Sequence, residues 1–333
     1  MRPYNLKRWH HLDILCLGHE PISPVVAEDF TKLIPHASHL QSLEFEDAEE
    51  TLRTHTDLAP SFAALQTIKH IIIVRGNQHT CSMLEAMRWP LESAMLHRTL
   101  FGLSWHDPDL LGRMHPATPL KNGRATLKYL NCHDWSGSAP SLPTYTYPVY
   151  PKLEALTVTN TRCSQAVQWA ISYPALKSLS VQTVESISHH FHVDEALLAD
   201  ARMLNIHKLA THGQPWGELE YFHGSVLDLY LLGFTCRIRH LYSWLNTSVD
   251  TLHFSPIMAT ARPTLLTLLM SVGLLYPPTT YLHAPGLADV KNLELHVTMC
   301  VDGSDGNEGD FDIDAFLVGS LFLDRLTLLI PGV

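Results

Sequence analysis

The sequence has few positive charges and no cluster of them. Lys and Arg together number 23 against 33 Asp and Glu, which gives a formal net charge of −10. Proteins that bind nucleic acid neutralise its phosphates with clustered Lys and Arg, so nucleic acid is not expected as a partner. The chain is 17% charged and 46% hydrophobic. That balance predicts a folded protein with a sizeable core and excludes a disordered chain.

The chain also lacks targeting and redox signals. Its six cysteines are scattered without a C-x-x-C pair, which is typical of reduced thiols in a cytoplasmic or nuclear protein. Asp13 breaks the first apolar run and no small-residue cleavage site follows it, so no secretion signal is expected. The most apolar stretch, 265–276, is shorter than the roughly 20 residues that a membrane span needs. We predict a buried helix there and no membrane association.

Motifs of catalysis and cofactor binding are absent from the sequence. It contains no G-x-S-x-G, phosphate loop, G-x-G-x-x-G or H-E-x-x-H. Ser136 and Ser138 lie beside His133 and Asp134, but neighbours in sequence rarely form a catalytic triad. We therefore expect no catalytic residue and no cofactor.

Metal-ligand spacing is missing as well. One histidine cluster, at His189, His190 and His192, has no Cys or carboxylate at a spacing typical of zinc sites. The acidic stretch 301–311 does not fit the calcium-loop pattern. The sequence predicts a solvated loop and a flexible acidic insertion, and no metal.

A repeat is present. The segments "YPKLEALTVTN" (150–160) and "YPALKSLSVQT" (173–183) share Tyr-Pro-x-Leu-x-x-Leu-x-Val, and their starts differ by 173 − 150 = 23 residues. Alternation of apolar and polar residues predicts a short half-buried strand in each. A unit of this length cannot bury its own apolar face, so it must stack on neighbouring units.

The looser pattern apolar-x-x-apolar-x-apolar recurs along the chain at intervals close to the leucine-rich-repeat period of ~20–29 residues. It predicts strands at 12–17, 40–45, 68–73, 100–105, 127–132, 153–158, 176–181, 201–206, 226–231, 249–254, 290–295 and 323–328. Helical periodicity lies between them at 25–34, 59–68, 164–173, 194–203 and 312–323.

The repeated order of strand, loop and helix predicts an α/β leucine-rich-repeat-like solenoid of about twelve irregular repeats. A curved parallel β-sheet would form its concave side and helices its convex side. We expect residues 1–333 to form a single domain of this kind, with loop insertions near 75–99, 134–150 and 301–311. The alternative is an ordinary α/β domain built on an open parallel sheet.

The two opening units, with "PHASHLQSLEFED" (35–47) and "RATLKYLNCHD" (124–134), resemble the leucine-rich-repeat portions of fungal F-box proteins. In that family a helix ends, a Pro or short polar turn follows, and Leu-x-x-Leu-x-Leu comes next. The resemblance implies the substrate-recognition part of a ubiquitin-ligase receptor. No Leu-Pro-x-Glu-type F-box helix precedes the first repeat, so binding to the ubiquitin-ligase adaptor is not implied.

The residues between the inward leucines would line the concave sheet. They are small, polar or aromatic and include no Lys or Arg, a composition that suits hydrogen bonding to a protein partner. The expected partner-binding residues are Ser104, His106, Tyr129, Asn131, His133, Thr157, Thr159, Ser180, Gln182, Asn205, His207, Asp228, Tyr230 and His253. The hypothesis is a non-catalytic protein–protein interaction solenoid, and the alternative is an enzyme with an unrecognised active site on an open α/β sheet.

Overall fold

The computed structural model describes residues 12–98, 118–134, 148–161, 166–183, 195–212, 216–245, 248–271, 285–298 and 325–329. The chain divides into two compact units. The N-terminal unit comprises Met1–Ser164 with Ile171–Leu176, and the C-terminal unit comprises Gln165–Ala170 with Lys177–Val333. The expectation of one single domain stays a prediction.

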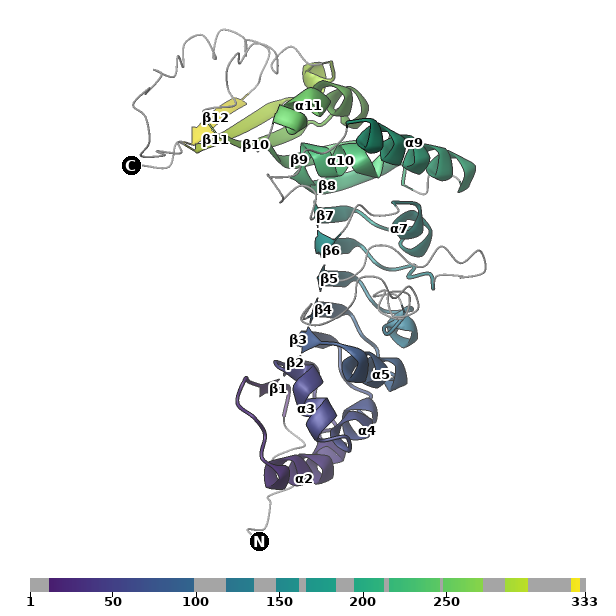
Figure 1. Cartoon of the computed structure of the whole chain (residues 1–333), viewed down its shortest axis with the longest axis vertical. Helices are drawn as coiled ribbons and strands as arrows, with labels where there is room; N and C mark the ends of the chain where they lie inside the picture. The colour runs from purple at the N-terminus through teal and green to yellow at the C-terminus, as the bar shows by residue number, and fades with distance from the viewer. Residues whose placement is uncertain are drawn as a thin grey trace. The chain divides into compact units, whose positions relative to one another are not determined.

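The N-terminal unit is built on parallel strands that lie in the order in which they occur in the sequence, from β1 to β6. These are β1 (Ile14–Leu17), β2 (Ser42–Phe45), β3 (His70–Gly76), β4 (Ser93–Arg98), β5 (Tyr129–His133) and β6 (Ala155–Thr161). Its helices are α2 (Pro24–Leu33), η1 (Ile34–His36), α3 (Ala48–Thr54), α4 (Leu58–Ala63), α5 (Gln78–Ala86) and η2 (Lys121–Gly123). Figure 1 labels the strands and the α-helices.

The C-terminal unit repeats the same parallel order from β7 to β12. Its strands are β7 (Ser178–Thr183), β8 (Glu218–Ser225), β9 (Arg237–Leu245), β10 (Leu265–Ser271), β11 (Asn292–Thr298) and β12 (Arg325–Leu329). Its helices are α9 (Glu195–His212), α10 (Val226–Leu232), α11 (Ser248–Ala261) and η4 (Leu287–Asp289), while α7 (Ala166–Ser172) contributes residues to both units. None of the helices in the described ranges is long and apolar enough to cross a membrane.

Strand register stacks the apolar residues of successive repeats into rows. In the N-terminal unit one row is buried throughout, at Leu15, Leu43, Ile71, Ala94, Leu130 and Leu156. The matching row of the C-terminal unit is Leu179, Phe222, Leu241, Leu266 and Leu293. Because side chains alternate between the two faces of a strand, each row places the intervening residues on the opposite face.

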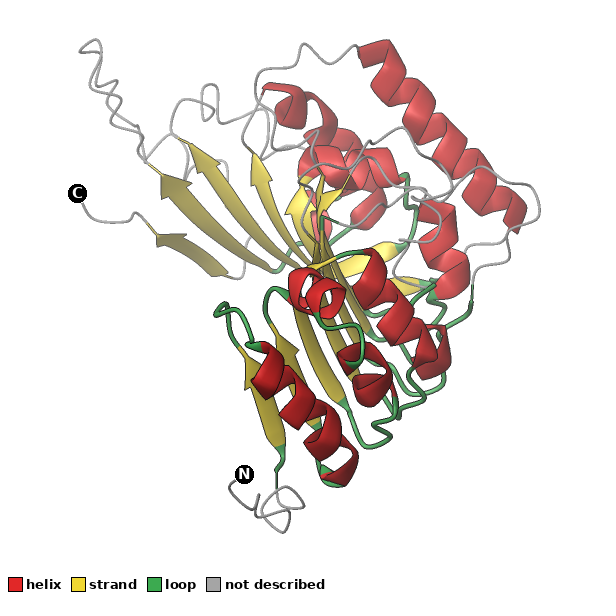
Figure 2. Cartoon of the chain, turned by 60° about the horizontal axis from the view of Figure 1, so that its bottom comes forward, coloured by secondary structure: helices red, strands yellow, loops and turns green. Residues whose placement is uncertain are grey.

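In each unit the described helices lie on one face of the sheet (Figures 1 and 2). On the other face most outward side chains are half-buried or exposed, although Thr267 is buried, and Met95 and Tyr129 retain 41% and 52% of their surface. A doubly wound sheet would carry helices on both faces. The structure therefore confirms the predicted α/β leucine-rich-repeat-like fold, with twelve strands in the described residues.

Three predicted strands of the C-terminal unit are wrong. Residues 201–206, 226–231 and 249–254 lie in α9, α10 and α11. The pattern apolar-x-x-apolar-x-apolar is too short and degenerate to exclude a helix, and residues such as Ala, Leu, Met and Arg in α9 favour helix. The true strands β8, β9 and β10 follow a strand alternation in "ELEYFHGS", "RIRHLYSWL" and "LLTLLMS".

The expected helix over 265–276 is also wrong in its described part, because β10 occupies Leu265–Ser271. A short apolar run fits a buried strand as well as a helix. Residues 75–99, expected as an insertion, contain α5 and β4 and so form a repeat of their own. The predicted strand at 100–105 and the insertion at 301–311 lie outside the described residues, as does most of 134–150.

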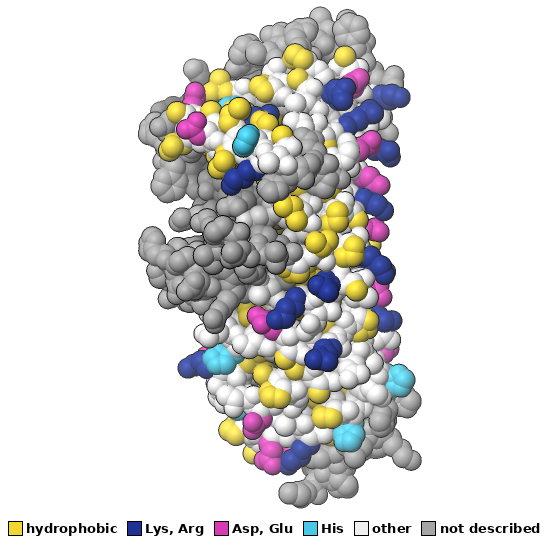
Figure 3. Space-filling model, turned by 90° about the vertical axis from the view of Figure 1, so that its right-hand side faces the viewer, with side chains coloured by type: hydrophobic (Ala, Val, Ile, Leu, Met, Phe, Trp, Pro, Cys, Tyr) yellow, Lys and Arg dark blue, Asp and Glu magenta, His cyan; other side chains and the backbone are white. Residues whose placement is uncertain are grey.

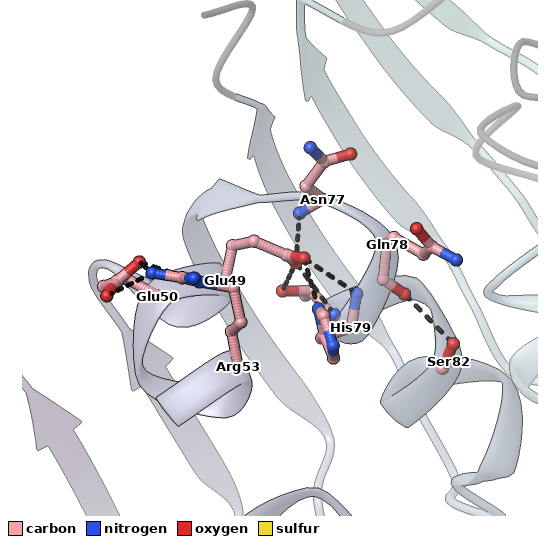
Figure 4. A network of polar contacts seen from close by, with 8 residues as sticks. Glu49, Glu50, Arg53, Asn77, Gln78, His79 and Ser82 are labelled. Carbon is pink, nitrogen blue, oxygen red and sulfur yellow. Dashed lines mark hydrogen bonds and ion pairs between the residues drawn. The ribbon is translucent and has the colours of Figure 1, made fainter. Parts of the chain in front are cut away.

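A carboxylate joins two neighbouring repeats of the N-terminal unit at the start of α5 (Figure 4). Glu49, from α3, accepts hydrogen bonds from the backbone N–H groups of Asn77 (2.9 Å), His79 (3.0 Å) and Thr80 (3.1 Å). The His79 imidazole and the Thr80 hydroxyl also contact it, at 2.8 and 3.1 Å. Burial raises the pKa of Glu49, but the hydrogen bonds from His79 and Thr80 outweigh it and the pKa is lowered.

The C-terminal unit uses the same device between β7, α10 and α11. Asp228 is fully buried and accepts from the backbone N–H and the hydroxyl of Thr183, at 3.1 and 2.6 Å. It also completes a capping box with Ser225 at the start of α10. Asp250, from α11, accepts from the Leu227 N–H at 3.0 Å. Asp250 thus satisfies a backbone donor at the start of the preceding helix, whereas Asp228 satisfies one at the end of β7 and one at the start of its own helix.

Charges of alternating sign precede the strands. In the N-terminal unit the residues Lys69, Glu92, Lys128 and Glu154 are joined by backbone hydrogen bonds from each N–H to the preceding carbonyl. Lys128 Nζ lies 2.8 Å from Glu92 Oε2. Figure 3 shows basic and acidic side chains alternating along one edge of the molecule. A one-residue slip of register would disrupt this order of charges as well as the leucine rows.

Replacing Glu49 with Ala should lower the free energy of unfolding by about 1–3 kcal/mol, because three backbone N–H groups at the start of α5, two of them in part-buried bonds, lose their acceptor. Its neighbour Glu50 forms an exposed ion pair with Arg53, and Glu50→Ala should cost less than about 1 kcal/mol. Urea denaturation of both variants measures the difference. The Glu49 contribution should disappear as pH falls through its lowered pKa, since a carboxyl stabilised as the anion loses that advantage when protonated. Equal losses in the two variants would contradict the capping role.

Adjacent residues of β6 test the register. Leu156 is buried and Thr157 is half-exposed on the outward face. Leu156→Ala should cost roughly 2–5 kcal/mol through lost burial and a cavity, whereas Thr157→Arg should cost well under about 1 kcal/mol. Thermal and urea unfolding of the two variants measure the contrast. A larger loss of stability for Thr157→Arg than for Leu156→Ala would mean that the assigned register of β6 is wrong by one residue.

Candidate functional site

The outward face of the C-terminal unit carries a group of aromatic side chains that we call the aromatic face. It consists of Tyr221 and His223 on β8 with His240, Tyr242 and Trp244 on β9. Register pairs Tyr221 with His240 and His223 with Tyr242. All five side chains are half-buried, because they pack against one another and leave one side open.

The rings of the aromatic face contact across the two strands. His223 lies 4.8 Å from Tyr242 and 5.1 Å from Trp244, measured between ring centroids, with edge-to-face geometry. Tyr221 meets His240 in the same way at 5.0 Å. Such arrangements match the edge of one ring to the face of another. The result is a packed aromatic surface two strands wide.

Polar groups flank the aromatic face on both sides. Ser180 Oγ on β7 lies 2.9 Å from His223 Nδ1. On the other side His240 Nε2 lies 3.2 Å from Thr267 Oγ1 on β10, and that hydroxyl donates to Glu294 Oε2 on β11 at 3.3 Å. Arg237 and Arg239 are exposed at the start of β9, and Arg239 is paired with Glu218 on β8. The segments 221–223 and 240–244, which carry the aromatic face, contain no Lys or Arg. The face therefore combines aromatic surface with hydrogen-bonding groups, and the Glu294 carboxylate lies on its β11 side.

Burial sets the charge of the histidines. It lowers the pKa of His223 and of His240, and for His240 the nearby Glu294 charge only partly offsets the effect. Burial, and then Tyr242, raise the pKa of Tyr221. The imidazoles are thus neutral at neutral pH, and the face offers hydrogen bonds without positive charge.

The arrangement does not provide an activated nucleophile among the described residues. Ser180 and His223 are in contact. Among the described residues no carboxylate contacts His223 to orient its ring, as a catalytic triad requires. Burial raises the pKa of the Cys81 thiol to about 12 and that of Cys236 to about 11. These thiols are protonated at neutral pH and are poor nucleophiles.

Part of the predicted binding set lies where expected. Tyr129, Asn131 and His133 on β5, Thr157 and Thr159 on β6, and Ser180 and Gln182 on β7 all occupy outward positions of their strands. Register brings Asn131 beside Thr157 and His133 beside Thr159. Whether these residues bind a partner stays a prediction, and Ser104 and His106 lie outside the described residues.

Five predicted residues are misplaced, because their segments are helical rather than extended. Asn205 is buried in α9 and donates to the Leu231 carbonyl at 2.8 Å, while His207 is exposed on the same helix. Asp228 is the buried cap described above. Tyr230 and His253, from α10 and α11, stack with ring centroids 3.7 Å apart. None of the five lies on the sheet face.

Sequence reasoning missed the aromatic face because the strands that carry it were assigned elsewhere. A signal was available. In "LEYFHGS" and "IRHLYSWL" buried apolar residues alternate with Tyr, His and Trp, the period-two pattern of a half-buried strand.

Comparison with known proteins gives a structural likeness but no match in sequence. No protein-family model and no curated protein sequence matches the chain. Among solved structures, the leucine-rich repeat-containing protein LegL7 from Legionella pneumophila is similar, with a TM-score of 0.45 and 13% sequence identity. The match covers 95% of this chain and 90% of that chain. The repeat fold described here rests on strand order and register alone.

Lowered histidine pKa values make stability depend on pH. Because folded His223 and His240 bind protons less readily than in the unfolded chain, unfolding is favoured as pH falls from about 6.5 toward the folded pKa. Urea denaturation at pH 7.5 and pH 5 should show a loss of stability on acidification. The double variant His223→Asn, His240→Asn should lose less between the two pH values. An equal loss would place the pH dependence in other groups.

Proposed function

We propose that the protein is a non-catalytic interaction scaffold that binds a protein partner through the aromatic face. The observation that carries the proposal is a contiguous set of Tyr, His and Trp side chains on a sheet face that the described helices leave uncovered. Tyr and Trp are enriched at the energetic centres of protein interfaces. A prepacked aromatic surface also loses little conformational entropy on binding.

The chemistry of the face favours a partner that presents apolar and basic side chains. Faces of Trp and Tyr rings attract Lys and Arg, and Glu294 lies at the side of the face toward β11. Arg237 and Arg239 are exposed at the start of β9, but Arg239 is paired with Glu218, and the segments 221–223 and 240–244 contain no Lys or Arg. The net charge of −10 adds long-range attraction for a basic partner.

The resemblance to F-box proteins supports a narrower form of the proposal. In that form the partner is a substrate of a ubiquitin ligase, and the chain serves as the substrate-recognition part of the receptor. This form requires that the ubiquitin-ligase adaptor be recovered with the protein from cells, which the interaction scaffold alone does not require.

Affinity purification of the tagged full chain from its native cell tests both forms. Trp244→Ala and Tyr242→Ala should each reduce recovery of the partner at least tenfold, since truncating a central aromatic anchor costs on the order of 2 kcal/mol or more. The matched control is Leu252→Ala, which removes an exposed apolar side chain from α11.

Circular dichroism should show that all three variants are folded. Partner recovery that is unchanged in the Trp244 and Tyr242 variants would reject the aromatic face as the binding site. Absence of the adaptor from the wild-type sample would reject the ubiquitin-ligase form and leave the scaffold form in place.

A further inference from the structure

Two imidazoles and a carboxylate meet at the ends of β4 and β5 in the N-terminal unit. The groups are His97 on β4, His133 on β5 and Asp134 immediately after β5. His133 Nδ1 lies 2.8 Å from Asp134 Oδ2, and His97 Nε2 lies 3.7 Å from the same oxygen. One ligand atom from each residue lies within 4.8 Å of those of the other two.

The backbone sets this convergence. Parallel pairing places His97 directly beside His133, so both side chains leave the same face of neighbouring strands, and their ring centroids lie 4.2 Å apart. Asp134 adopts a left-handed conformation with φ of 60°, which Asp tolerates better than most residues. Its N–H donates to the Thr159 carbonyl on β6 at 3.1 Å, which ties this turn to the next strand.

We infer that His97, His133 and Asp134 bind one divalent transition-metal ion of the Zn²⁺ class. Zinc takes imidazole nitrogens and carboxylate oxygens at ~2.0–2.2 Å, so tetrahedral ligand atoms lie about 3.3 Å apart. The observed separations bracket that value, and small side-chain rotations bring the three atoms into place. Two imidazoles with one carboxylate is also the ligand set of open three-residue metal sites.

Exposure and charge are compatible with such an ion. The side chains of His97 and His133 are 37% and 43% exposed, whereas Asp134 is 10% exposed. An ion would therefore be reached from solvent and keep at least one coordination position for water or a ligand. Two positive charges lie nearby, those of Arg75 and Arg98. The negative charge of Asp134 offsets their repulsion of a metal cation.

Calorimetric titration of Zn²⁺ into the chelator-stripped full chain tests the inference. Wild type should bind an equivalent of Zn²⁺ that His97→Ala, His133→Ala and Asp134→Asn lose or bind at least on the order of 100-fold more weakly, since even changes around the ligands cost 10- to 100-fold. Zn²⁺ should also raise the melting temperature of wild type more than that of these variants. Asn tolerates a left-handed backbone, so Asp134→Asn keeps the turn.

Controls separate this site from other histidines. His70→Ala removes an exposed imidazole from β3 on the same sheet, and the triple variant His189→Ala, His190→Ala, His192→Ala removes the sequence cluster. Both variants should still bind the equivalent of Zn²⁺ that we assign to His97, His133 and Asp134, with wild-type affinity. The inference is overturned if wild type takes up no Zn²⁺, if the His97 and His133 variants keep wild-type stoichiometry and affinity, or if only the triple variant loses the equivalent.

Discussion

Parallel pairing between strands of successive repeats is the interaction on which the rest of each unit depends. A four- to nine-residue strand has one apolar face and two unpaired backbone edges, and it can satisfy neither alone. The next strand in the sequence supplies hydrogen bonds at one edge and extends the buried row by one apolar side chain. Helices then cover the inward face. The same neighbouring strand therefore both buries the leucines and pairs the backbone groups.

Helix starts create the second demand, because their first N–H groups have no partner within the helix. Glu49 and Asp250 accept from helix-start N–H groups of a neighbouring repeat, and Asp228 accepts from the start of its own helix and from Thr183 at the end of β7. These bonds tie helices to neighbouring repeats at the strand ends, where the apolar rows stop. A carboxylate in such a place is buried for structural reasons. Asp228 shows this well, since a residue expected on a binding face is instead a fully buried cap.

The sequence predicted the repeat fold best where the leucine spacing follows residues that end a helix. Leu153, Leu156 and Val158 follow Tyr-Pro, which does not continue a helix, so the strand β6 was expected. The apolar residues at 226–231 and 249–254 have the same spacing without such a stop, and they form the helices α10 and α11. Of the site, the outward residues of β5, β6 and β7 were predictable for that reason. The aromatic face was not, because contacts such as that of His223 with Trp244 depend on a strand register that a misassigned strand cannot give.

Register also explains why the chemistry of this chain escapes a search for motifs. Residues that meet on the sheet are one repeat apart in sequence, and repeats here differ in length, so no fixed spacing connects His97 with His133 or His223 with Tyr242. What is constant is the position within the strand. Since the side-chain period is two, the inward positions can keep the core while the outward positions vary freely. The outward residues of the N-terminal unit are mainly polar and those of β8 and β9 in the C-terminal unit are aromatic, so two different surfaces share the same repeated core. The members of each surface correspond by their position within the strand, and not by their spacing in the sequence.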